Sequence, residues 1–433
     1  MTGTHTQSYN PPVPSQPGNY RRPLAVVTVL FFMWGFLTCL NDILVPHLKS
    51  IFELSYAQVM LIQFSFFSAY FVFSVPASKI VDWIGYQRTM VAGLMIMAVG
   101  AFLFVPAASA PSYSLFLTAL IILAAGITAL QVAANPYVIV LGAPATASSR
   151  LNLTQAFNSL GTTIAPKIGG LLILSATPLA IEEMRRLSPV ALQSYRAQQA
   201  ASVKMPYVVI GVLLVLLAVV IACSKLPKIG SAQRELGQPV HDSLWKHRNL
   251  ILGAVGIFTY VGAEVAIGSF LVNYFGQPGI AGLTEKAAAG YVSFYWGGAM
   301  IGRFIGSGLL RKVKTRRLLG LCVACTTTLL ITSILTTGHV AMWSILAVGF
   351  FNSIMFPSIF TLGLAELGPL SGDGSGILNM AIVGGAVIPL AQGFMADRIG
   401  IHHAFFLPVI CYLYILYYAL VGSEPNSERI RQA

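Results

Sequence analysis

The sequence predicts an all-α integral membrane protein with twelve transmembrane helices in two six-helix halves. Hydrophobic residues make up 56% of the 433-residue chain and charged residues only 9%, with a mean hydropathy of +0.76, whereas a soluble domain carries roughly 25% charged residues. The apolar residues form runs of about 20, the length that crosses a bilayer as a helix. The two halves of the chain also carry a weak internal repeat.

Twelve apolar runs are separated by short polar segments, and a longer polar break divides them six and six. The break, 225–249, predicts a cytoplasmic linker between an N-terminal half, 24–224, and a C-terminal half, 250–422. Residues 1–23 are polar and Pro-rich and predict a disordered cytoplasmic tail, and 423–433 predict a second tail. The predicted spans are 24–46, 58–79, 87–107, 114–141, 151–176, 206–224, 250–275, 287–310, 316–337, 340–366, 374–396 and 402–422.

The net charge of +12 follows the membrane topology and does not indicate a nucleic-acid partner. Lys and Arg lie between the apolar runs and form no basic domain. On alternate sides of the spans they divide into about 17 on the side of the N-terminus and about 7 on the other. Because basic loops stay in the cytoplasm, both termini and the linker are expected there.

The internal repeat relates helices in the two halves that have the same orientation. A shift of about 227 positions aligns several identical residues in corresponding spans, and a shift of about 221 aligns two prolines. This favours a duplication of six helices, as in transporters built from two parallel halves. The aligned residues are Gly35 with Gly262, Leu151-Asn152 with Leu378-Asn379, and Pro136 with Pro357.

Ionisable groups within spans are candidates for function, because an unpaired charge in hydrocarbon costs on the order of several kcal/mol. Asp42 lies late in the first span, beside Asn41 and four residues before Pro46. A carboxyl group buried there can take up a proton near neutral pH, as a proton-coupled carrier requires. The alternative is a helix-end carboxylate solvated by water at the outer interface.

Glu264 is the second buried acid, in the seventh span. Gly262 and Gly268 flank it and permit close packing or local unwinding beside a site. Its carboxylate can accept two hydroxyl hydrogen bonds from a polyol, so it is a candidate for sugar binding and for proton coupling. The alternative is a buried structural ion pair, for instance with Lys167 or Arg303.

Uncharged amides form a third candidate set. Gln131 and Asn135 share one face of the fourth span, and Asn152, Gln155 and Asn158 recur every three residues along the fifth. Amides donate and accept, as vicinal hydroxyl groups require, whereas a charged substrate favours Arg or Lys. The set indicates a neutral polyol substrate, with hydrogen bonding between helices as the alternative for each amide.

Aromatic side chains can stack on the apolar face of a sugar ring, although most are expected to be core or membrane-belt residues. The candidates are Trp34, Tyr295, Trp296, Phe351 and Phe356.

The cytoplasmic loop between the second and third spans is a candidate gate. It contains Asp82, Gly85 and Arg88, and its counterpart between the eighth and ninth spans is a basic run that includes Arg311. An acidic residue at a helix end can hold one conformation through an ion pair across the two halves and release it on rocking.

Catalytic, cofactor and metal signatures are missing from the sequence. The loops contain no P-loop, G-x-S-x-G or H-E-x-x-H spacing. Cys322 and Cys325 have C-x-x-C spacing within an apolar run, but no His or second Cys pair accompanies them. We therefore expect no enzyme, no cofactor, no metal site and no disulfide framework.

Several blocks carry a family resemblance that runs from the first span to the last. The 2–3 loop, S-K-I-V-D-W-I-G-Y-Q-R, looks like a degenerate form of the major facilitator superfamily motif G-x-x-x-D-R-x-G-R-R, with Ser78 and Trp83 in place of Gly and Arg. The other blocks resemble the fucose permease family of sugar:proton symporters. They are L-N-D-I-L-V-P-H-L-K-S-I-F (40–52), A-A-N-P-Y-V-I-V-L-G (133–142), S-R-L-N-L-T-Q-A-F-N-S-L-G (149–161), Y-V-G-A-E-V-A-I-G-S-F-L-V-N-Y (260–274) and F-N-S-I-M-F-P-S-I-F-T-L-G (351–363).

The resemblance implies a major facilitator fold and roles for individual residues. Asp42 corresponds to the family's acid linked to proton coupling, and Asn41 to its sugar-contacting neighbour. Gln155 and Asn158 correspond to sugar ligands.

One departure from the family bears on the substrate. L-fucose permeases have Glu at the position of Gln131 and Gln at the position of Glu264, so the two are exchanged here. The exchange argues against L-fucose, and the blocks at 260–275 and 294–304 look closer to the glucose/galactose transporter branch.

The resemblance implies import of a neutral hexose, most simply glucose or galactose, with a proton by alternating access. The expected partners are sugar, proton and the lipid of a bacterial inner membrane. The alternatives are L-fucose or N-acetylglucosamine as substrate, an uncoupled sugar facilitator, and a sugar sensor, which the short C-terminal tail disfavours.

Overall fold

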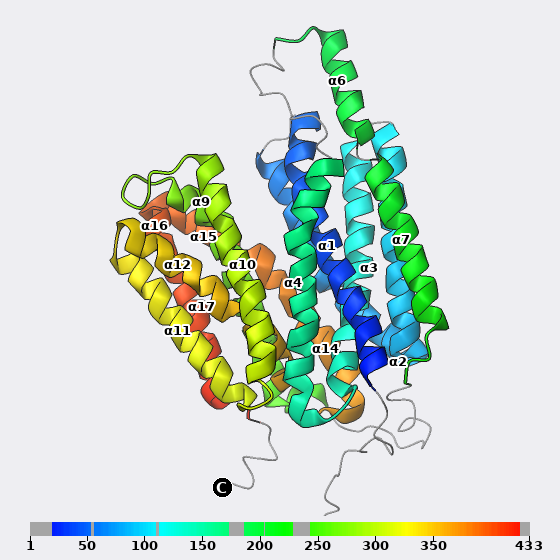
Figure 1. Ribbon diagram of the computed structural model, residues 1–433, viewed down its shortest axis with the longest axis vertical. Helices are drawn as coiled ribbons and strands as arrows, with labels where there is room; N and C mark the ends of the chain where they lie inside the picture. The colour runs from blue at the N-terminus through cyan, green and yellow to red at the C-terminus, as the bar shows by residue number, and fades with distance from the viewer. Residues whose placement is uncertain are drawn as a thin grey trace, which may run out of the picture.

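The computed structural model describes residues 20–52, 56–109, 112–172, 186–202, 204–227 and 243–424. Within these ranges the chain forms helices joined by short turns, and no strand occurs. The helices lie side by side and run roughly along the longest axis of the molecule (Figure 1). The all-α membrane fold that the hydropathy predicts is confirmed.

The N-terminal half consists of long helices, because a segment in hydrocarbon must satisfy its backbone hydrogen bonds internally. One shorter helix, α6, extends beyond the bundle at one end (Figure 1). The helices are α1 (Arg21–Phe52), α2 (Tyr56–Ser109), α3 (Tyr113–Val140), α4 (Ala147–Leu172), α6 (Pro189–Ser202) and α7 (Lys204–Cys223), with a 3₁₀ turn η1 (Pro144–Thr146) before α4.

The C-terminal half contains both continuous and interrupted spans. The continuous helices are α9 (Arg248–Phe275), α10 (Glu285–Leu309) and α11 (Thr315–Leu335). The interrupted crossings are α12 (Gly338–Asn352) with α13 (Met355–Gly363); α14 (Ser371–Met380) with η4 (Ala381–Val383) and α15 (Gly384–Ile399); and α16 (Ile401–Ala404) with α17 (Phe406–Tyr417) and the π-helical turn η5 (Tyr418–Gly422).

The predicted number of spans agrees with the structure. Eight described segments are long and apolar enough to cross a bilayer. One of them, Phe64–Ser109, holds two crossings, because Gly85 breaks α2 with φ 80° and ψ 167°, a conformation that glycine adopts without strain. With α1, α4 and α10, these segments make up the twelve predicted spans.

Two helices begin inside segments that the predictions assigned to the N-terminal tail and the linker. Residues 21–23, assigned to the N-terminal tail, are helical, and Pro23 is tolerated there because the first-turn N–H groups have no partner within the helix. The second helix is α9, which begins at Arg248, inside the segment assigned to the linker. Residues 1–19, 228–242 and 425–433, the rest of the predicted tails and most of the linker, lie outside the described residues.

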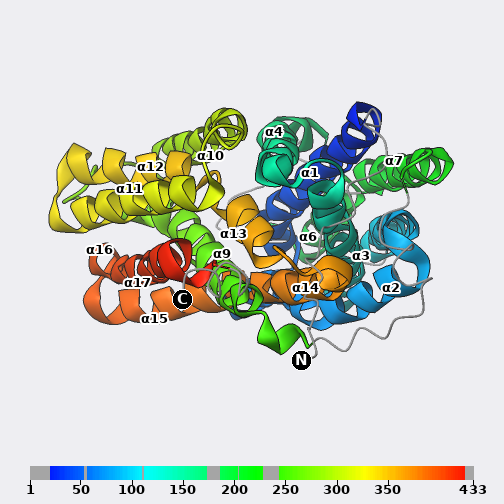
Figure 2. The same ribbon diagram turned by 90° about the horizontal axis from the view of Figure 1, so that it is seen from below.

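The two halves meet along a seam in which α4 packs against α10 and α13, and α2 and α3 pack against α14. Both ends of the described chain lie at one end of the bundle, here called the terminal end (Figure 1). Viewed from that end, α13 and α14 lie between the halves (Figure 2). Hydrogen bonds that cross the seam on this side are Ser149 Oγ to Ser307 O at 2.6 Å, Thr315 Oγ1 to Ser148 Oγ at 2.9 Å, and Ser375 Oγ to Val132 O at 2.9 Å.

Within the N-terminal half, α2 and α3 approach each other at two glycines. A Cβ atom on Gly126 would lie 2.6 Å from the backbone N of Met97 and 2.7 Å from the carbonyl O of Gly93. A Cβ atom on Gly93 would lie 2.9 Å from the carbonyl O of Gly126. Small residues permit this backbone contact between membrane helices.

We expect Gly126→Ala to lower the free energy of unfolding by about 1–3 kcal/mol, because the added methyl group collides with backbone atoms that cannot turn away. Gly290→Ala is the matched control, since a Cβ atom on this exposed α10 residue would meet nothing within 4 Å. Thermal unfolding of the purified proteins in detergent measures both. An unchanged melting temperature for Gly126→Ala would contradict the tight helix contact.

Candidate functional site

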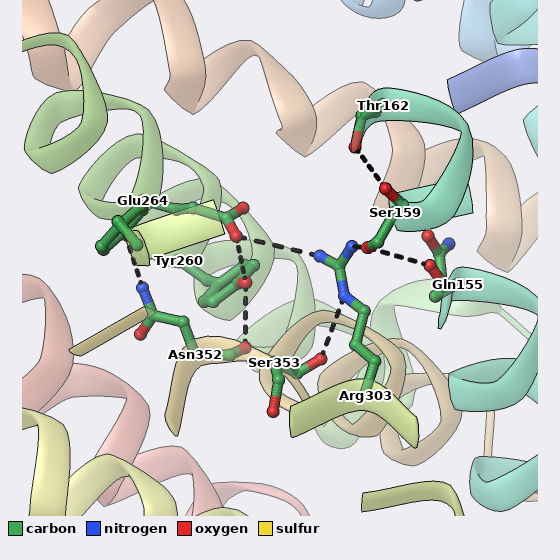
Figure 3. Close-up of polar contacts among 9 residues, drawn as sticks. Gln155, Ser159, Thr162, Tyr260, Glu264, Arg303, Asn352 and Ser353 are labelled. Atoms are coloured by element: carbon green, nitrogen blue, oxygen red, sulfur yellow. Dashed lines mark hydrogen bonds and ion pairs between the residues drawn. The ribbon is translucent and has the colours of Figure 1, made fainter. Parts of the chain in front are cut away.

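Two charged side chains meet inside the bundle, Glu264 on α9 and Arg303 on α10. Nη2 of Arg303 lies 3.9 Å from Oε1 of Glu264, and each side chain is 13% exposed (Figure 3). The ion pair with Arg303 that the sequence left open is therefore present. The side chain of Lys167, the other candidate partner, lies outside the described part of the chain.

Tyr260 and Asn352 complete the surroundings of the carboxylate. Tyr260 precedes Glu264 by one helical turn, and its hydroxyl lies 2.8 Å from Oε1 of Glu264 and 3.0 Å from the carbonyl O of Asn352. The Asn352 amide donates to the hydroxyl of Tyr295 at 3.0 Å. Tyr295 thus reaches the site through its hydroxyl, with its ring fully buried, and its expected stacking on a sugar stays a prediction.

The break between α12 and α13 supplies backbone acceptors to this site. Pro357 has no N–H, so the carbonyl of Ser353, four residues earlier, has no helical partner. That carbonyl accepts a hydrogen bond from Nε of Arg303 at 3.3 Å. The interruption therefore directs a backbone dipole toward the guanidinium.

Arg303 also contacts the N-terminal half across the seam. Its Nη1 donates to Oγ of Ser159 on α4 (Figure 3), and its backbone carbonyl accepts from Nδ2 of Asn152 at 2.7 Å. Ser159 was not among the predicted site residues, although it lies seven residues after Asn152 and so on the same helix face. One guanidinium thus binds a carboxylate of its own half and a hydroxyl of the other.

The three predicted amides of α4 differ in their surroundings. Asn152 lies at the seam, whereas Asn158 donates to the carbonyl O of Phe31 on α1 at 2.9 Å, within its own half. Gln155 is buried, and its Nε2 atom has no hydrogen-bond partner among the described residues. The three side chains point in different directions, because a spacing of three residues falls short of a full helical turn. Over the set this spreads them through roughly 120° around the helix axis.

A second polar group lies in the N-terminal half, where α1, α2 and α3 meet. Nε2 of Gln131 donates to the hydroxyl of Tyr70 at 2.7 Å, and Trp34 is a second hydrogen-bond partner of that hydroxyl. One turn along α3, both amide atoms of Asn135 lack a partner in the described part of the chain, as does Oε1 of Gln131. Since buried polar atoms are usually paired, water or a bound ligand is expected to complete them.

Asn41 and Asp42 lie within α1, but their side chains fall outside the described residues. Their sugar-binding and proton-coupling roles therefore stay predictions.

An ion pair that was not predicted from the sequence joins the halves at the terminal end. Nζ of Lys79 on α2 lies 2.7 Å from Oδ1 of Asp373 on α14. Oγ of Ser78 lies 3.5 Å from the same oxygen. The available signal was an acidic residue in the first turn of a helix, where the helix dipole stabilises it.

One of the three predicted gating residues, Asp82, lies near this ion pair. Asp82 faces α14, since a Cβ atom on Gly372 would lie 3.2 Å from its Oδ1 atom. Arg88 and Arg311 are exposed. The predicted latch by Asp82, Arg88 and Arg311 stays a prediction beside the ion pair that the structure contains.

The described residues contain no group of three or more His, Cys, Asp or Glu that could hold a metal ion. Cys322 and Cys325 are free thiols in a partly buried position on α11.

The sequence matches known transporters over most of its length. A family model described as Major Facilitator Superfamily matches residues 25–383. The chain is 52% identical over 406 residues to the glucose/galactose transporter of Brucella abortus biovar 1 (strain 9-941), covering 94% of this chain and 95% of that one. It is 34% identical over 437 residues to the L-fucose-proton symporter of Escherichia coli (strain K12), covering 98% of each chain.

The fold matches a solved structure equally well. FucP, a Major Facilitator Superfamily transporter in the outward conformation, aligns with a TM-score of 0.84 and 34% identity over 94% of this chain and 99% of that one. These relatives are transporters and not enzymes. The chain therefore belongs to the Major Facilitator Superfamily and, within it, to the fucose permease-type family, on the side of the glucose/galactose transporters.

Proposed function

We propose that this chain imports a neutral hexose, glucose or galactose, together with a proton, by alternating access of its two six-helix halves. The observation that carries the proposal is a set of buried amide atoms with no hydrogen-bond partner among the described residues, in a chain 52% identical to a glucose/galactose transporter. The 34% identity with an L-fucose-proton symporter supports the coupling to protons.

The chemistry of the unpaired amides supports a neutral polyol as substrate. Gln131 and Asn135 each offer an acceptor, and Asn135 and Gln155 each offer a donor, so two donors and two acceptors are free to meet hydroxyl groups. The nearby cation, Arg303, is already engaged by Glu264 and two seryl oxygens. A substrate with a fixed negative charge would have to displace one of these partners. The proposed sugar-binding residues are Asn41, Gln131, Asn135, Gln155, Asn158, Glu264, Trp34 and Tyr295.

Asp42 and Glu264 are the proposed proton carriers. Glu264 is buried beside Tyr260 and Arg303, where the charge of its carboxylate has a large effect on its surroundings. Asp42 lies in α1 toward the other end of the bundle, where we place proton entry. Protonation of an acid would then permit the sugar-loaded carrier to rock.

We place the terminal end in the cytoplasm of a bacterial inner membrane. Basic residues at this end, among them Arg21, Arg22, Lys79, Arg311 and Lys312, support the orientation through the positive-inside rule. The seam contacts on this side, and the likeness to a transporter in the outward conformation, support assignment of the structure to an outward-facing state. In that state Lys79 and Asp373, with Asp82 beside them, would act as a releasable cytoplasmic latch.

Uptake into proteoliposomes tests the function. Purified protein should accumulate labelled galactose when the outside is more acidic than the lumen, and an uncoupler should abolish accumulation. Competition by glucose, L-fucose and N-acetylglucosamine ranks the substrates. Uptake that equilibrates and ignores the uncoupler would instead identify a facilitator, and preferred competition by L-fucose would overturn the glucose/galactose assignment.

Asp42→Asn should abolish accumulation against a gradient, because an amide cannot take up and release the transported proton. Equilibrative exchange of sugar should persist in this variant. Proteoliposome uptake with and without a proton gradient measures both activities. Asp397→Asn is the matched control, an exposed carboxylate on α15, and undiminished accumulation by Asp42→Asn would remove Asp42 from the proton pathway.

Asn135→Ala should weaken sugar binding about 3- to 10-fold, because it removes one donor and one acceptor offered to hydroxyl groups. The variant should unfold at a temperature close to that of the wild type, since the lost atoms have no hydrogen-bond partner in the part of the chain that the structure describes. Isothermal titration of galactose measures the affinity. Gln198→Ala, an exposed amide on α6, is the control, and equal affinities in both variants would exclude Asn135 from the site.

A further inference from the structure

Arg303 is the one described residue whose charged side chain joins the buried carboxylate to the seam. Within the C-terminal half it pairs with Glu264 at 3.9 Å and donates to the carbonyl of Ser353 at 3.3 Å. Across the seam it donates to Ser159, and its own carbonyl accepts from Asn152 at 2.7 Å. Separation of the halves at α4 and α10 would break the last two contacts.

The charges around Glu264 are few and can be named. Tyr260 on its own helix, Tyr295 on α10 and Tyr412 on α17 are the titratable groups that surround it together with Arg303. The tyrosines are neutral at physiological pH, and a guanidinium does not lose its proton in a protein. The net charge of this group is therefore zero while Glu264 is ionised and +1 when Glu264 carries a proton.

We propose that Arg303 couples the charge of Glu264 to the seam between the halves. While Glu264 is ionised, the pair is neutral and the seam at α4 and α10 stays closed. When a proton neutralises Glu264, the guanidinium remains buried without a counter-ion, and opening of the seam toward the terminal end relieves this by admitting water.

This coupling rests on the proposed function and links protonation of Glu264 to the opening of one side of the carrier, while the proton gradient sets the direction of net transport. A proton that reaches Glu264 from the side opposite the terminal end would favour the state open toward the cytoplasm. After release of the proton the pair would re-form and close the seam. Arg303 would act as a positioning residue whose contacts change with the charge of the Glu264 carboxylate, and it would not itself carry the transported proton.

A disulfide across the seam reports its closure. Ser148→Cys and Thr315→Cys place thiols where the hydroxyl oxygens now lie 2.9 Å apart, in a background in which Cys39, Cys223, Cys322, Cys325 and Cys411 are replaced by serine. The rate of oxidative cross-linking is measured in detergent at a single pH and without sugar, so that thiol ionisation and substrate do not vary between variants.

A double-mutant cycle gives the decisive comparison. Glu264→Gln should slow cross-linking about tenfold or more, because it leaves Arg303 unpaired. Glu264→Gln combined with Arg303→Gln should restore a rate close to that of the parent, since neither charge remains. Glu264→Asp, which keeps the charge, should cross-link like the parent, and Asp397→Asn with Arg398→Gln are exposed controls for charge removal.

Two outcomes would overturn the coupling. One is Glu264→Gln cross-linking as fast as the parent, and the other is the double variant remaining as slow as Glu264→Gln. Restoration in the double variant also excludes misfolding as the cause of the single-variant effect. Because the assay contains no sugar, the expected pattern in a protein that fails to accumulate hexose would refute the proposed cargo and leave the coupling standing.

Discussion

One guanidinium charge lies largely buried where the two halves meet, and its partners come from both of them. Arg303 is held by the carboxylate of Glu264, a backbone carbonyl and a hydroxyl from the opposite half. Removing one partner of a buried ion pair costs about 3–5 kcal/mol, against a total stability of roughly 5–15 kcal/mol for a folded protein. On the proposed coupling, a single proton on Glu264 would shift the balance between two packings of the halves without unfolding either half, as a rocking carrier requires.

Two prolines that the internal repeat aligns each leave a backbone carbonyl without its helical donor. Both carbonyls accept hydrogen bonds near the seam, and no ionisable residue is added. Pro136 leaves the carbonyl of Val132 without its helical donor, and Ser375 of the other half fills that place at 2.9 Å. Pro357 does the same for Ser353, whose carbonyl binds Arg303. Duplication of a helix with one proline thus yields two free backbone acceptors, one on each half. Each costs little in hydrocarbon because a neighbouring side chain satisfies it.

The sequence was sufficient to predict the spans, because charged residues are rare within the long apolar runs. For the same reason it was sufficient to predict Glu264 as a buried acid, since few other charges lie within those runs. It was insufficient for Tyr70 and Ser159. Ser and Thr hydroxyl groups in membrane helices often bond to their own backbone, as Thr128 does to the carbonyl of Ala124, so residue type alone does not single out Ser159. The hydroxyl of Tyr70 bonds to Gln131 on another helix, a pairing that depends on how α2 packs against α3. The Lys79 to Asp373 pair joins residues 294 positions apart, and their meeting depends on the relative placement of the halves.

The resemblance to L-fucose permeases implied that Glu and Gln are exchanged between positions 131 and 264. The structure shows what surrounds each of these two positions. At position 131 a neutral amide donates a hydrogen bond to the hydroxyl of Tyr70. At position 264 the carboxylate lies beside the cation that reaches across the seam. On the proposed function, each half contributes one acid to the proton pathway, Asp42 on α1 and Glu264 on α9, and the neutral amides that bind hydroxyl groups lie mainly in the N-terminal half. Since Glu264 and Arg303 lie where the halves meet, a change of charge there would act on the same contacts that hold α4 against α10.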